Sequence, residues 1–529
     1  MPTDCISYQN SGYFTKLIVD YLNQEPELQS LYHRFPTLEN FRLQAEEKAS
    51  HFPEENRNVL VTALEKQYSG FEVSEATKAN IALLKDPKTL TITTGHQLNL
   101  FTGPLYFLYK IVSAINLSKQ LKAAHPEFNF VPVYWMATED HDFEEINYFY
   151  FRNKKIQWNR ESNGPVGRLS TEGLEAVFEV FSKELGVGTN AEYLRELFKN
   201  AYLKHSNLTD ATRYLANELF KEQGLVIIDG DDAELKKLFI PYVKQELTEQ
   251  TSYTKVSETI EKFKNYTVQV NPREINLFYI DNDLRERIVF EDGIYQINNT
   301  KITFSESELL AELENSPEKF SPNVILRPLY QEVILPNICY IGGGGELAYW
   351  LELKSMFEAY NMVFPILLLR NSVLLATEKQ AGKADKLNLN WNDLFSKQTD
   401  LLNRKTSEFS GLNLDFSEQK EFLKRQFEKL NDMAAQTDKS FLGAVKAQET
   451  KQIKGLDALE KRLLKAEKRK HSEELLRIST LQNELFPNQS LQERKANFSE
   501  FYLENGNKLL HEIFEKLQPL SDTFQIIIP

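Results

Sequence analysis

The residues best suited to chemistry in this chain are an imidazole and the carboxylates around it. His141 lies in the run Glu139-Asp140-His141-Asp142, and two more glutamates follow closely. Such density could orient His141 as a general base, or ligate a divalent metal ion together with a second histidine. Acidic residues also stabilise helix N-termini, which gives a purely structural alternative. We favour a role for this cluster in acid–base chemistry or in orienting a substrate, because the buried run 130–137 leads directly into it. We assign no metal to it.

The second histidine, His96, lies in a polar loop that leads into a helix. Pro104 follows the loop at a position where proline is favoured, in the first turn of the helix. A lone histidine is more often structural, but a loop rich in amides and hydroxyls before a helix N-terminus is better explained as an anion or nucleotide contact. Thr102 is the expected helix cap. The candidate residues of this loop are His96, Gln97, Asn99, Thr102 and Gly103.

A glycine run forms a third candidate site between a predicted strand, 337–341, and a predicted helix, 346–360. Residues 343–348 satisfy the pattern GxGxxA, which binds a pyrophosphate in this context, although a close packing turn explains it equally well. The next predicted strand, 364–369, ends in Arg370, which suits a carboxylate or phosphate group of a substrate. The candidate binding residues here are Tyr330, Gly342, Gly343, Gly344, Gly345, Glu346, Arg370, Asn371 and Ser372.

A strand–helix–strand pattern must position the first two clusters. The β-rich run 90–93 is followed by a helix whose apolar residues recur at spacings of three and four, and then by the apolar run 130–137. Such a unit has parallel strands and a right-handed crossover. Ligands of parallel sheets bind beyond the carboxyl ends of the strands. We therefore predict that His96, Glu139, His141, Glu346 and Arg370 border one cleft.

The whole chain predicts an α/β fold, with a Rossmann-like parallel sheet core, inserted connecting segments and an α-helical coiled-coil domain. Residues 1–375 form the core, with N-terminal helices and insertions at about 145–320. Within the insertions, Ser305 and Glu308 have the spacing of a capping box. Residues 376–486 form an antiparallel helical coiled coil, and 487–529 return to the core, ending in a strand that we expect in the main sheet.

The coiled-coil region contains a heptad pattern. Its apolar positions alternate spacings of four and three, which predicts one seam, and a further set resumes after a phase shift. A seam of this length leaves an apolar stripe that needs a partner beyond its own hairpin, so we predict a homodimer through residues 376–486. The positions of the seam are Leu423, Phe427, Leu430, Ala434, Thr437, Phe441, Ala444 and Gln448.

Composition excludes several classes of protein. The net charge of −14 argues against a nucleic-acid surface, because phosphate contacts need clustered basic residues. The N-terminus has no signal-peptide pattern and no apolar run approaches the length of a membrane helix, so we predict a cytoplasmic protein. The two cysteines, Cys5 and Cys339, are far apart and outside any metal-binding spacing, and we interpret each as a small packed hydrophobe.

Four long motifs, in order, closely resemble the bacillithiol synthase family: GHQLNLFTGPLY, VPVYWMATEDHDFEEIN, RPLYQEVILPNICYIGGGGELAYW and PILLLRNS. The resemblance covers nearly the whole chain, including the section LQERKANF. It implies a Rossmann-like core with inserted segments and a coiled-coil domain that pairs two subunits. It also implies a ligase that condenses L-cysteine with glucosaminyl malate through an amide bond.

The route of carboxyl activation stays open at this point. Neither a HIGH tetrapeptide nor a KMSKS loop is readable, so no motif requires a nucleotide such as ATP or ADP as cofactor. Either a nucleotide activates the cysteine carboxyl here, or an activated cysteine arrives from elsewhere. Two other functions compete: an NADP-dependent oxidoreductase, in which Arg370 meets the 2′-phosphate, and a noncatalytic scaffold built around the coiled coil.

Overall fold

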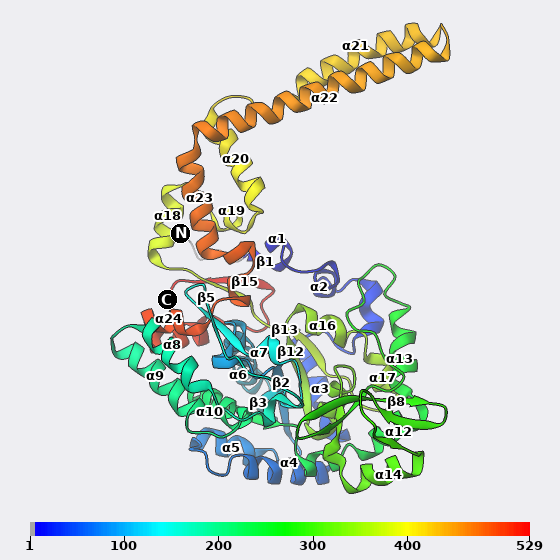
Figure 1. Ribbon diagram of the computed structural model, residues 1–529, viewed down its shortest axis with the longest axis vertical. Helices are drawn as coiled ribbons and strands as arrows, with labels where there is room; N and C mark the ends of the chain where they lie inside the picture. The colour runs from blue at the N-terminus through cyan, green and yellow to red at the C-terminus, as the bar shows by residue number, and fades with distance from the viewer. Residues whose placement is uncertain (1–5) are drawn as a thin grey trace.

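A parallel β-sheet lies at the centre of the protein in the computed structural model, which describes residues 6–529 (Figure 1). From one edge to the other its strands are β6 (Val226–Asp229), β3 (Asn129–Met136), β2 (Thr89–His96), β12 (Asn337–Gly342) and β13 (Ile366–Leu369). Every neighbouring pair is parallel. Numbered along the chain, the order is 3-2-1-4-5, which is the Rossmann order and confirms the predicted fold class. The order reverses between β2 and β12.

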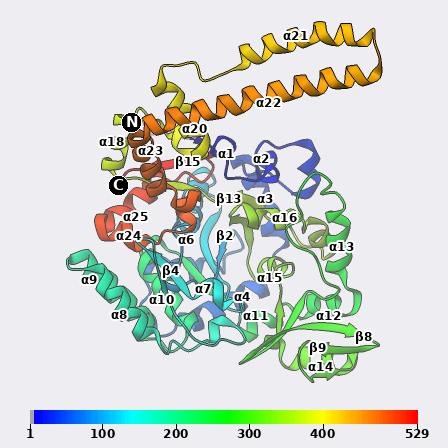
Figure 2. The ribbon, with the colours of Figure 1, turned by 45° about the horizontal axis from the view of Figure 1, so that its top comes forward.

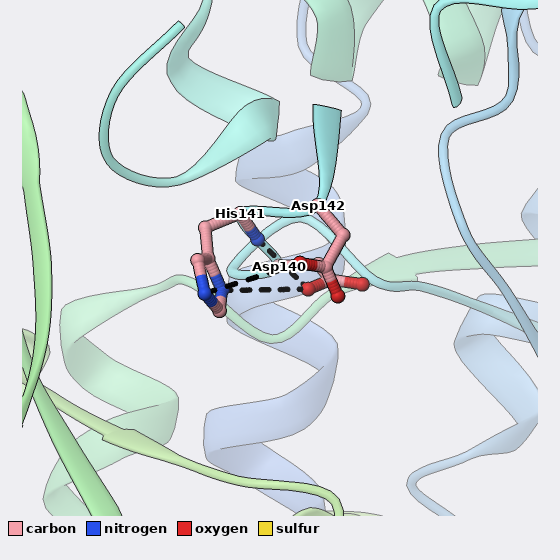
Figure 3. A group of neighbouring side chains, drawn as sticks. All are labelled: Asp140, His141 and Asp142. Atoms are coloured by element: carbon pink, nitrogen blue, oxygen red, sulfur yellow. Dashed lines mark hydrogen bonds and ion pairs between the residues drawn. The ribbon is translucent and has the colours of Figure 1, made fainter. Parts of the chain in front are cut away.

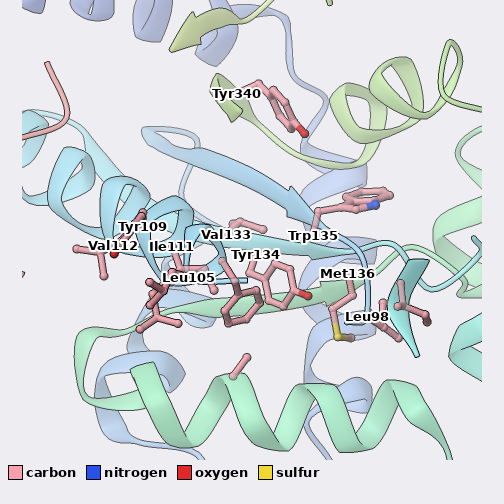
Figure 4. Close-up of a cluster of buried hydrophobic side chains, with 14 of the residues drawn as sticks. Leu98, Leu105, Tyr109, Ile111, Val112, Val133, Tyr134, Trp135, Met136 and Tyr340 are labelled. Carbon is pink, nitrogen blue, oxygen red and sulfur yellow. The ribbon is translucent and has the colours of Figure 1, made fainter. Parts of the chain in front are cut away.

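The predicted strand–helix–strand unit is present. Helix α6 (Tyr106–Ala124) crosses from β2 to β3, and these two strands pair in parallel over their whole length. The strands read as apolar runs because both faces of the sheet are covered. Helix α3 (Leu38–His51) and α6 share one buried cluster with β2 and β12. Figure 4 shows side chains of α6 and β3, among them Val112 and Tyr134, in a second cluster of buried hydrophobic residues.

The loop after β2 differs from the prediction. Strand β2 extends to His96, and α6 begins only at Tyr106, with Leu105 at its N-cap. Thr102 therefore does not cap the helix, and that prediction is wrong. It lies instead in a 3-10 turn, Leu100–Thr102, in which Phe101 and Thr102 have left-handed backbone conformations with φ of 47° and 68°.

The N-terminal region is mainly helical, as predicted, and a first insertion of helices with one hairpin lies between β3 and β6. Strand β1 (Ile6–Ser7) precedes the N-terminal helices, and Cys5 lies outside the described residues. The N-terminal helices are α1 (Tyr8–Ser11), α2 (Lys16–Leu22), α3, α4 (Glu54–Gln67) and α5 (Glu75–Leu83). The insertion contains α7 (Phe143–Ile146), β4 (Tyr148–Phe151), β5 (Lys154–Gln157), α8 (Leu174–Leu185), α9 (Thr189–Tyr202) and α10 (Leu208–Phe220).

A second insertion, between β6 and β12, carries an antiparallel sheet of its own, with the strand order β10-β9-β8-β7-β11. The predicted capping box of Ser305 and Glu308 opens α14. Its strands are β7 (Leu277–Asp281), β8 (Leu284–Glu291), β9 (Ile294–Ile297), β10 (Thr303–Phe304) and β11 (Phe320–Pro322). Its helices are α11 (Ala233–Lys237), α12 (Ile240–Glu249), α13 (Thr251–Ile260), α14 (Glu306–Asn315) and α15 (Arg327–Ile334).

The helix predicted at 346–360 is divided in two. Helix α16 (Gly344–Trp350) and helix α17 (Lys354–Ala359) are separated by a short turn that contains Glu352. The side chain of Glu352 is fully buried and accepts hydrogen bonds from the backbone N–H groups of Gln269 and Val270, at 2.7 and 3.3 Å. The turn thus anchors the segment that leads into the inserted sheet.

A long helical hairpin projects from the rest of the protein (Figures 1 and 2). The predicted single seam is wrong, because the chain reverses between α21 (Ser417–Ala435) and α22 (Lys439–Lys470). Asp438 caps the returning helix by accepting from the N–H groups of Ser440 and Phe441, which explains why a new helix begins there although the heptad spacing continues. The helices that connect the hairpin to the core are α18 (Glu378–Lys386), α19 (Trp391–Phe395), α20 (Gln398–Ser410) and α23 (Ser472–Leu485).

The C-terminal strand also lies elsewhere than expected. Strand β15 (Thr523–Ile527) pairs with β1 and with β14 (Val373–Leu375) in a separate small sheet, and does not join the parallel sheet. Helices α24 (Phe498–Asn505) and α25 (Asn507–Lys516) precede it and contact α9 and α6, respectively. No helix within residues 6–529 is long and apolar enough to cross a membrane.

We expect the hairpin to be the dimer interface. Its two helices leave apolar side chains exposed, with Phe422 at 63% and Leu459 at 53%, and both line a groove of about 950 Å³ between α21 and α22. Such a surface favours burial against a second copy. Replacing Phe422 and Leu459 by glutamate should raise the dimer dissociation constant by at least about tenfold for each side chain. Light scattering over a concentration series measures this constant, and an unchanged dimer would place the interface elsewhere.

Candidate functional site

A cleft of about 780 Å³ lies along the carboxyl edge of the parallel sheet. His96, Glu139, His141, Glu346 and Arg370 all line it, so the predicted convergence of these distant residues is confirmed. The cleft includes the point between β2 and β12 where the strand order reverses, which is where open parallel sheets bind ligands. The other predicted residues on its walls are Gln97, Asp140, Asp142, Gly343 and Gly345.

Several predicted site residues do not line this cleft. Asn99 and Gly103 line a smaller neighbouring cavity of about 370 Å³. The Tyr330 hydroxyl donates to the carbonyl of Gly230 at 2.7 Å, which fixes the packing of α15 rather than a ligand. Asn371 donates to the Gln518 carbonyl at 2.8 Å. The predicted residues that line neither cavity are Thr102, Tyr330, Gly342, Gly344, Asn371 and Ser372.

His96 is buried, with only 7% of its surface exposed, and its Nε2 atom has no hydrogen-bond partner within residues 6–529. Burial, followed by the charges of Lys110 and Arg370, holds its pKa well below the usual value, while a hydrogen bond to the Thr102 backbone opposes this. A bond to the backbone raises the pKa of a histidine when the ring is the donor, so we infer that Nδ1 carries the proton. Nε2 is therefore left as a free acceptor in a neutral imidazole.

The buried Lys110 and the half-buried Glu346 form an ion pair that the sequence analysis missed. The Lys110 Nζ atom lies 2.5 Å from Glu346 Oε2 and 2.7 Å from the carbonyl oxygen of Gly95. Burial alone would raise the pKa of Glu346, but Lys110 and hydrogen bonds from Gly343 N–H and the Tyr340 hydroxyl lower it. The signal was a lysine within the apolar sequence of α6. The ammonium of Lys110 lies close enough to His96 for its charge to lower the pKa of the ring.

The glycine run has a structural explanation. The Gly343 N–H donates to the carboxylate of Glu346 at 2.8 Å, so the protein itself occupies the amide that a pyrophosphate would need. A Cβ atom on Gly342 would lie only 2.9 Å from the Glu346 Cβ, which leaves no space for a side chain. Helix α16 is also short. These features favour the close packing turn over a dinucleotide site.

Arg370 is already engaged within the protein. Its Nη2 atom lies 2.7 Å from Glu493 Oε1, and its Nη1 atom donates to the Asn371 carbonyl at 3.0 Å. Arg370 is 5% exposed and Glu493 is fully buried. Only Nε of the guanidinium lacks a partner within the described chain. The two Nη atoms of Arg370 are therefore not available for bidentate binding of a substrate, which corrects the interpretation of Arg370 as the anion ligand.

The acidic cluster divides into a buried and an accessible part. The Glu139 carboxylate pairs with Lys236, which is almost fully buried, at 2.5 Å. Asp140, His141 and Asp142 lie together at the cleft (Figure 3), with ligand-type atoms within 4.8 Å of one another. Burial and the charge of Asp140 raise the pKa of Asp142. The His141 Nδ1 atom contacts the guanidinium of Arg285, which leaves Nε2 as its remaining ligand atom.

The His96 loop is held by a residue from the C-terminal region. Asn497 is fully buried, and its amide donates to the carbonyls of Phe101 and Gly103 at 2.7 and 2.6 Å. These bonds brace the left-handed residues of the turn, a conformation that surrounding contacts must enforce. The segment LQERKANF belongs to the resemblance, but nothing in its sequence indicates this contact.

We expect Asn497→Asp to lower kcat by about tenfold to a hundredfold with a small change in KM, because a misplaced loop shifts His96. The aspartate keeps the size but loses both donors. Steady-state kinetics measure the effect, and the matched control is Asn505→Asp, because Asn505 is the last residue of α24 and bonds within that helix, to the Phe501 carbonyl. Equal kinetics for both variants would show that Asn497 does not position the loop.

Comparisons with known proteins cover the whole chain. A family model for the N-terminal Rossmann-like domain of bacillithiol biosynthesis BshC matches residues 1–371, and one for the C-terminal coiled-coil domain of BshC matches 373–529. Proteins named "Putative cysteine ligase BshC" are 66% identical in Flavobacterium johnsoniae, 64% in Flavobacterium psychrophilum and 57% in Christiangramia forsetii. Each alignment covers 100% of this chain and at least 99% of the relative.

Among solved structures, one titled "putative arginyl t-RNA synthetase" from Campylobacter jejuni aligns with 83% of this chain and 94% of its own. Its TM-score of 0.21 and identity of 12% are too low to support a conclusion. The family models and the full-length relatives, in contrast, do support a conclusion about the family. This chain belongs to the BshC family of bacillithiol biosynthesis.

Proposed function

We propose that this protein is a ligase that joins the carboxyl group of L-cysteine to the amine of glucosaminyl malate through an amide bond. Family membership supports the reaction class, since the full-length relatives are named as cysteine ligases. The observation that carries the proposal is His96, which lines the cleft at the reversal point of the sheet and whose buried Nε2 atom has no hydrogen-bond partner within residues 6–529. Amide formation needs such an acceptor.

The chemistry assigns a role to each side of the cleft. The sugar amine attacks the cysteinyl carbonyl carbon, the leaving group departs with the electrons of its bond, and the nitrogen sheds a proton. His96 Nε2 accepts that proton as general base. The accessible carboxylates of Asp140 and Asp142 suit the ammonium of cysteine. Glu139 is neutralised by Lys236 and is no longer assigned to this task.

Activation of the carboxyl has two routes. A free carboxylate is a poor electrophile, so the acyl group must carry a leaving group before the amine attacks. A nucleotide binding in the cleft would supply it, or the activated cysteine would arrive from another reaction. The proposal requires only the acyl transfer, which is common to both routes.

The two competing functions lose their support. An NADP-dependent oxidoreductase needed the Gly343 amide and the fork of Arg370, but Glu346 and Glu493 occupy these groups. A noncatalytic scaffold does not explain why His96 lines the cleft with a buried ring nitrogen that has no partner in the described chain.

Calorimetric titration with glucosaminyl malate, NADPH and ATP tests the proposal, followed by mass spectrometry of a reaction with cysteine. We expect glucosaminyl malate to bind and NADPH to give no heat, with product formed once an activated cysteine or ATP is present. Binding of NADPH without binding of the sugar would favour the oxidoreductase. If neither ligand binds and no product forms, the scaffold is favoured.

A further inference from the structure

The cations of the cleft differ in whether they are neutralised. Arg370 pairs with Glu493, Lys110 with Glu346 and Lys236 with Glu139. Four arginines of the second insertion also line the cleft but have no carboxylate within ion-pair distance in the part of the chain that the structure describes. One of them, Arg327, donates instead to Gln331 and to the Tyr349 hydroxyl. We call the other three the arginine wall; it consists of Arg273, Arg285 and Arg287.

The inserted sheet holds the wall on one face. Arg285 and Arg287 are two positions apart on β8, so their side chains lie on the same side of the sheet. Their partners across the β7–β8 hairpin are Ile280 and Phe278. The guanidinium of Arg285 lies 3.9 Å from the centre of the Phe278 ring, which also lines the cleft. Arg273 precedes β7 and lines the same wall.

The environment of the wall favours an anion that is not part of the protein. Arg285 and Arg287 are half-buried, and the Nε atom of Arg285 is buried with no acceptor within residues 6–529. Burial lowers the pKa of Arg285, while the charges of Asp140, Glu139 and Asp142 oppose this, and its Nη1 atom contacts Nδ1 of the neighbouring His141. Exposed arginines are ordinary on a protein surface. A guanidinium N–H group that is buried without an acceptor is destabilising unless a negatively charged group binds to it.

We propose that the arginine wall binds a doubly negative oxyanion group of a substrate. Guanidinium groups recognise carboxylate and phosphate oxygens in pairs, so the dicarboxylate of malate and the phosphates of a nucleotide share the required chemistry. The assignment to the malate of glucosaminyl malate rests on the proposed function. It moves the anion site from Arg370 at the end of β13 to the inserted sheet, which makes the second insertion a substrate-binding element.

Calorimetry on the full-length protein tests the proposal with malate and pyrophosphate as probes. We expect Arg285→Gln and Arg287→Gln each to weaken binding of one probe at least about tenfold, and added salt to weaken it in the wild type. Lys301→Gln is the matched control, because Lys301 is an exposed cation of the same insertion outside the cleft. The probe that binds more tightly identifies the source of the anion.

The proposal is overturned if the wild type binds neither probe, if both arginine variants bind like the wild type, or if Lys301→Gln loses as much affinity. Thermal unfolding of each variant confirms that the fold is intact. Failure here is separable from failure of the proposed function. Normal product formation with unchanged probe binding overturns only the anion site, whereas probe binding that depends on the wall without any product overturns only the ligase assignment.

Discussion

Replacing His96 by asparagine should lower turnover by about two to four orders of magnitude, the usual contribution of a positioned general base. Asparagine keeps a hydrogen-bonding group at the end of β2 but cannot accept a proton. Substrate affinity should change little, because Asp140 and the arginine wall stay in place. Single-turnover measurements with saturating substrates isolate this chemical step from binding and product release.

The matched control is His141→Asn, since His141 is the other histidine that lines the cleft within residues 6–529. Its side chain is 42% exposed and its Nδ1 atom contacts Arg285, so it is less well placed to accept a proton. We expect less than a tenfold loss of turnover. The opposite pattern, with a large loss for His141→Asn and a small one for His96→Asn, would assign the base to His141.

The pH dependence gives an independent check on His96. Its pKa lies well below 6.5 because of burial and the charges of Lys110 and Arg370, so the neutral, accepting form persists as the pH falls below 6.5. The acid limb of kcat/KM should therefore lie well below pH 6.5, where an exposed histidine would already be protonated. A limb at or above pH 6.5 would contradict His96 as the base in the free enzyme.

Replacing Arg370 by leucine should destabilise the protein by about 3–5 kcal/mol, because it leaves the buried carboxylate of Glu493 without its cation. Glu493 also accepts from the Val373 N–H at 3.0 Å, so the pair joins the end of the parallel sheet to the C-terminal segment. We expect a large fall in the urea midpoint of the core. Arg370→Lys keeps the charge and should retain most of the stability.

An exposed ion pair provides the control for Arg370. Lys383 and Glu484 are paired at 3.0 Å, with side-chain exposures of 40% and 36%. Lys383→Leu should cost less than about 1 kcal/mol, since solvent screens such pairs. If Arg370→Leu unfolds like the wild type yet loses affinity for glucosaminyl malate, Arg370 is a substrate ligand and the structural role is wrong.

The sequence predicted the parts of this protein that depend on local periodicity. Apolar residues spaced three and four apart predicted α6, and uninterrupted apolar runs predicted β3, β12 and β13, because an element buried on one or both faces must carry that pattern. The parallel βαβ geometry then placed His96, Glu139 and His141 at one edge of the sheet, although the residues lie far apart in the chain. Convergence on one cleft followed from topology alone.

Only the tertiary structure decided which side chains of the cleft are free. Arg370 and Glu493 are 123 residues apart, and the partners of Lys110 and Asn497 are equally unmarked, since a pairing between distant segments leaves no periodic trace in sequence. The heptad pattern had the same weakness, because its spacing continues through the turn at Asp438. Residue types could therefore indicate that the site handles anions and protons, but only the packing showed that His96 Nε2 has no hydrogen-bond partner, and the arginine wall no paired carboxylate, within residues 6–529.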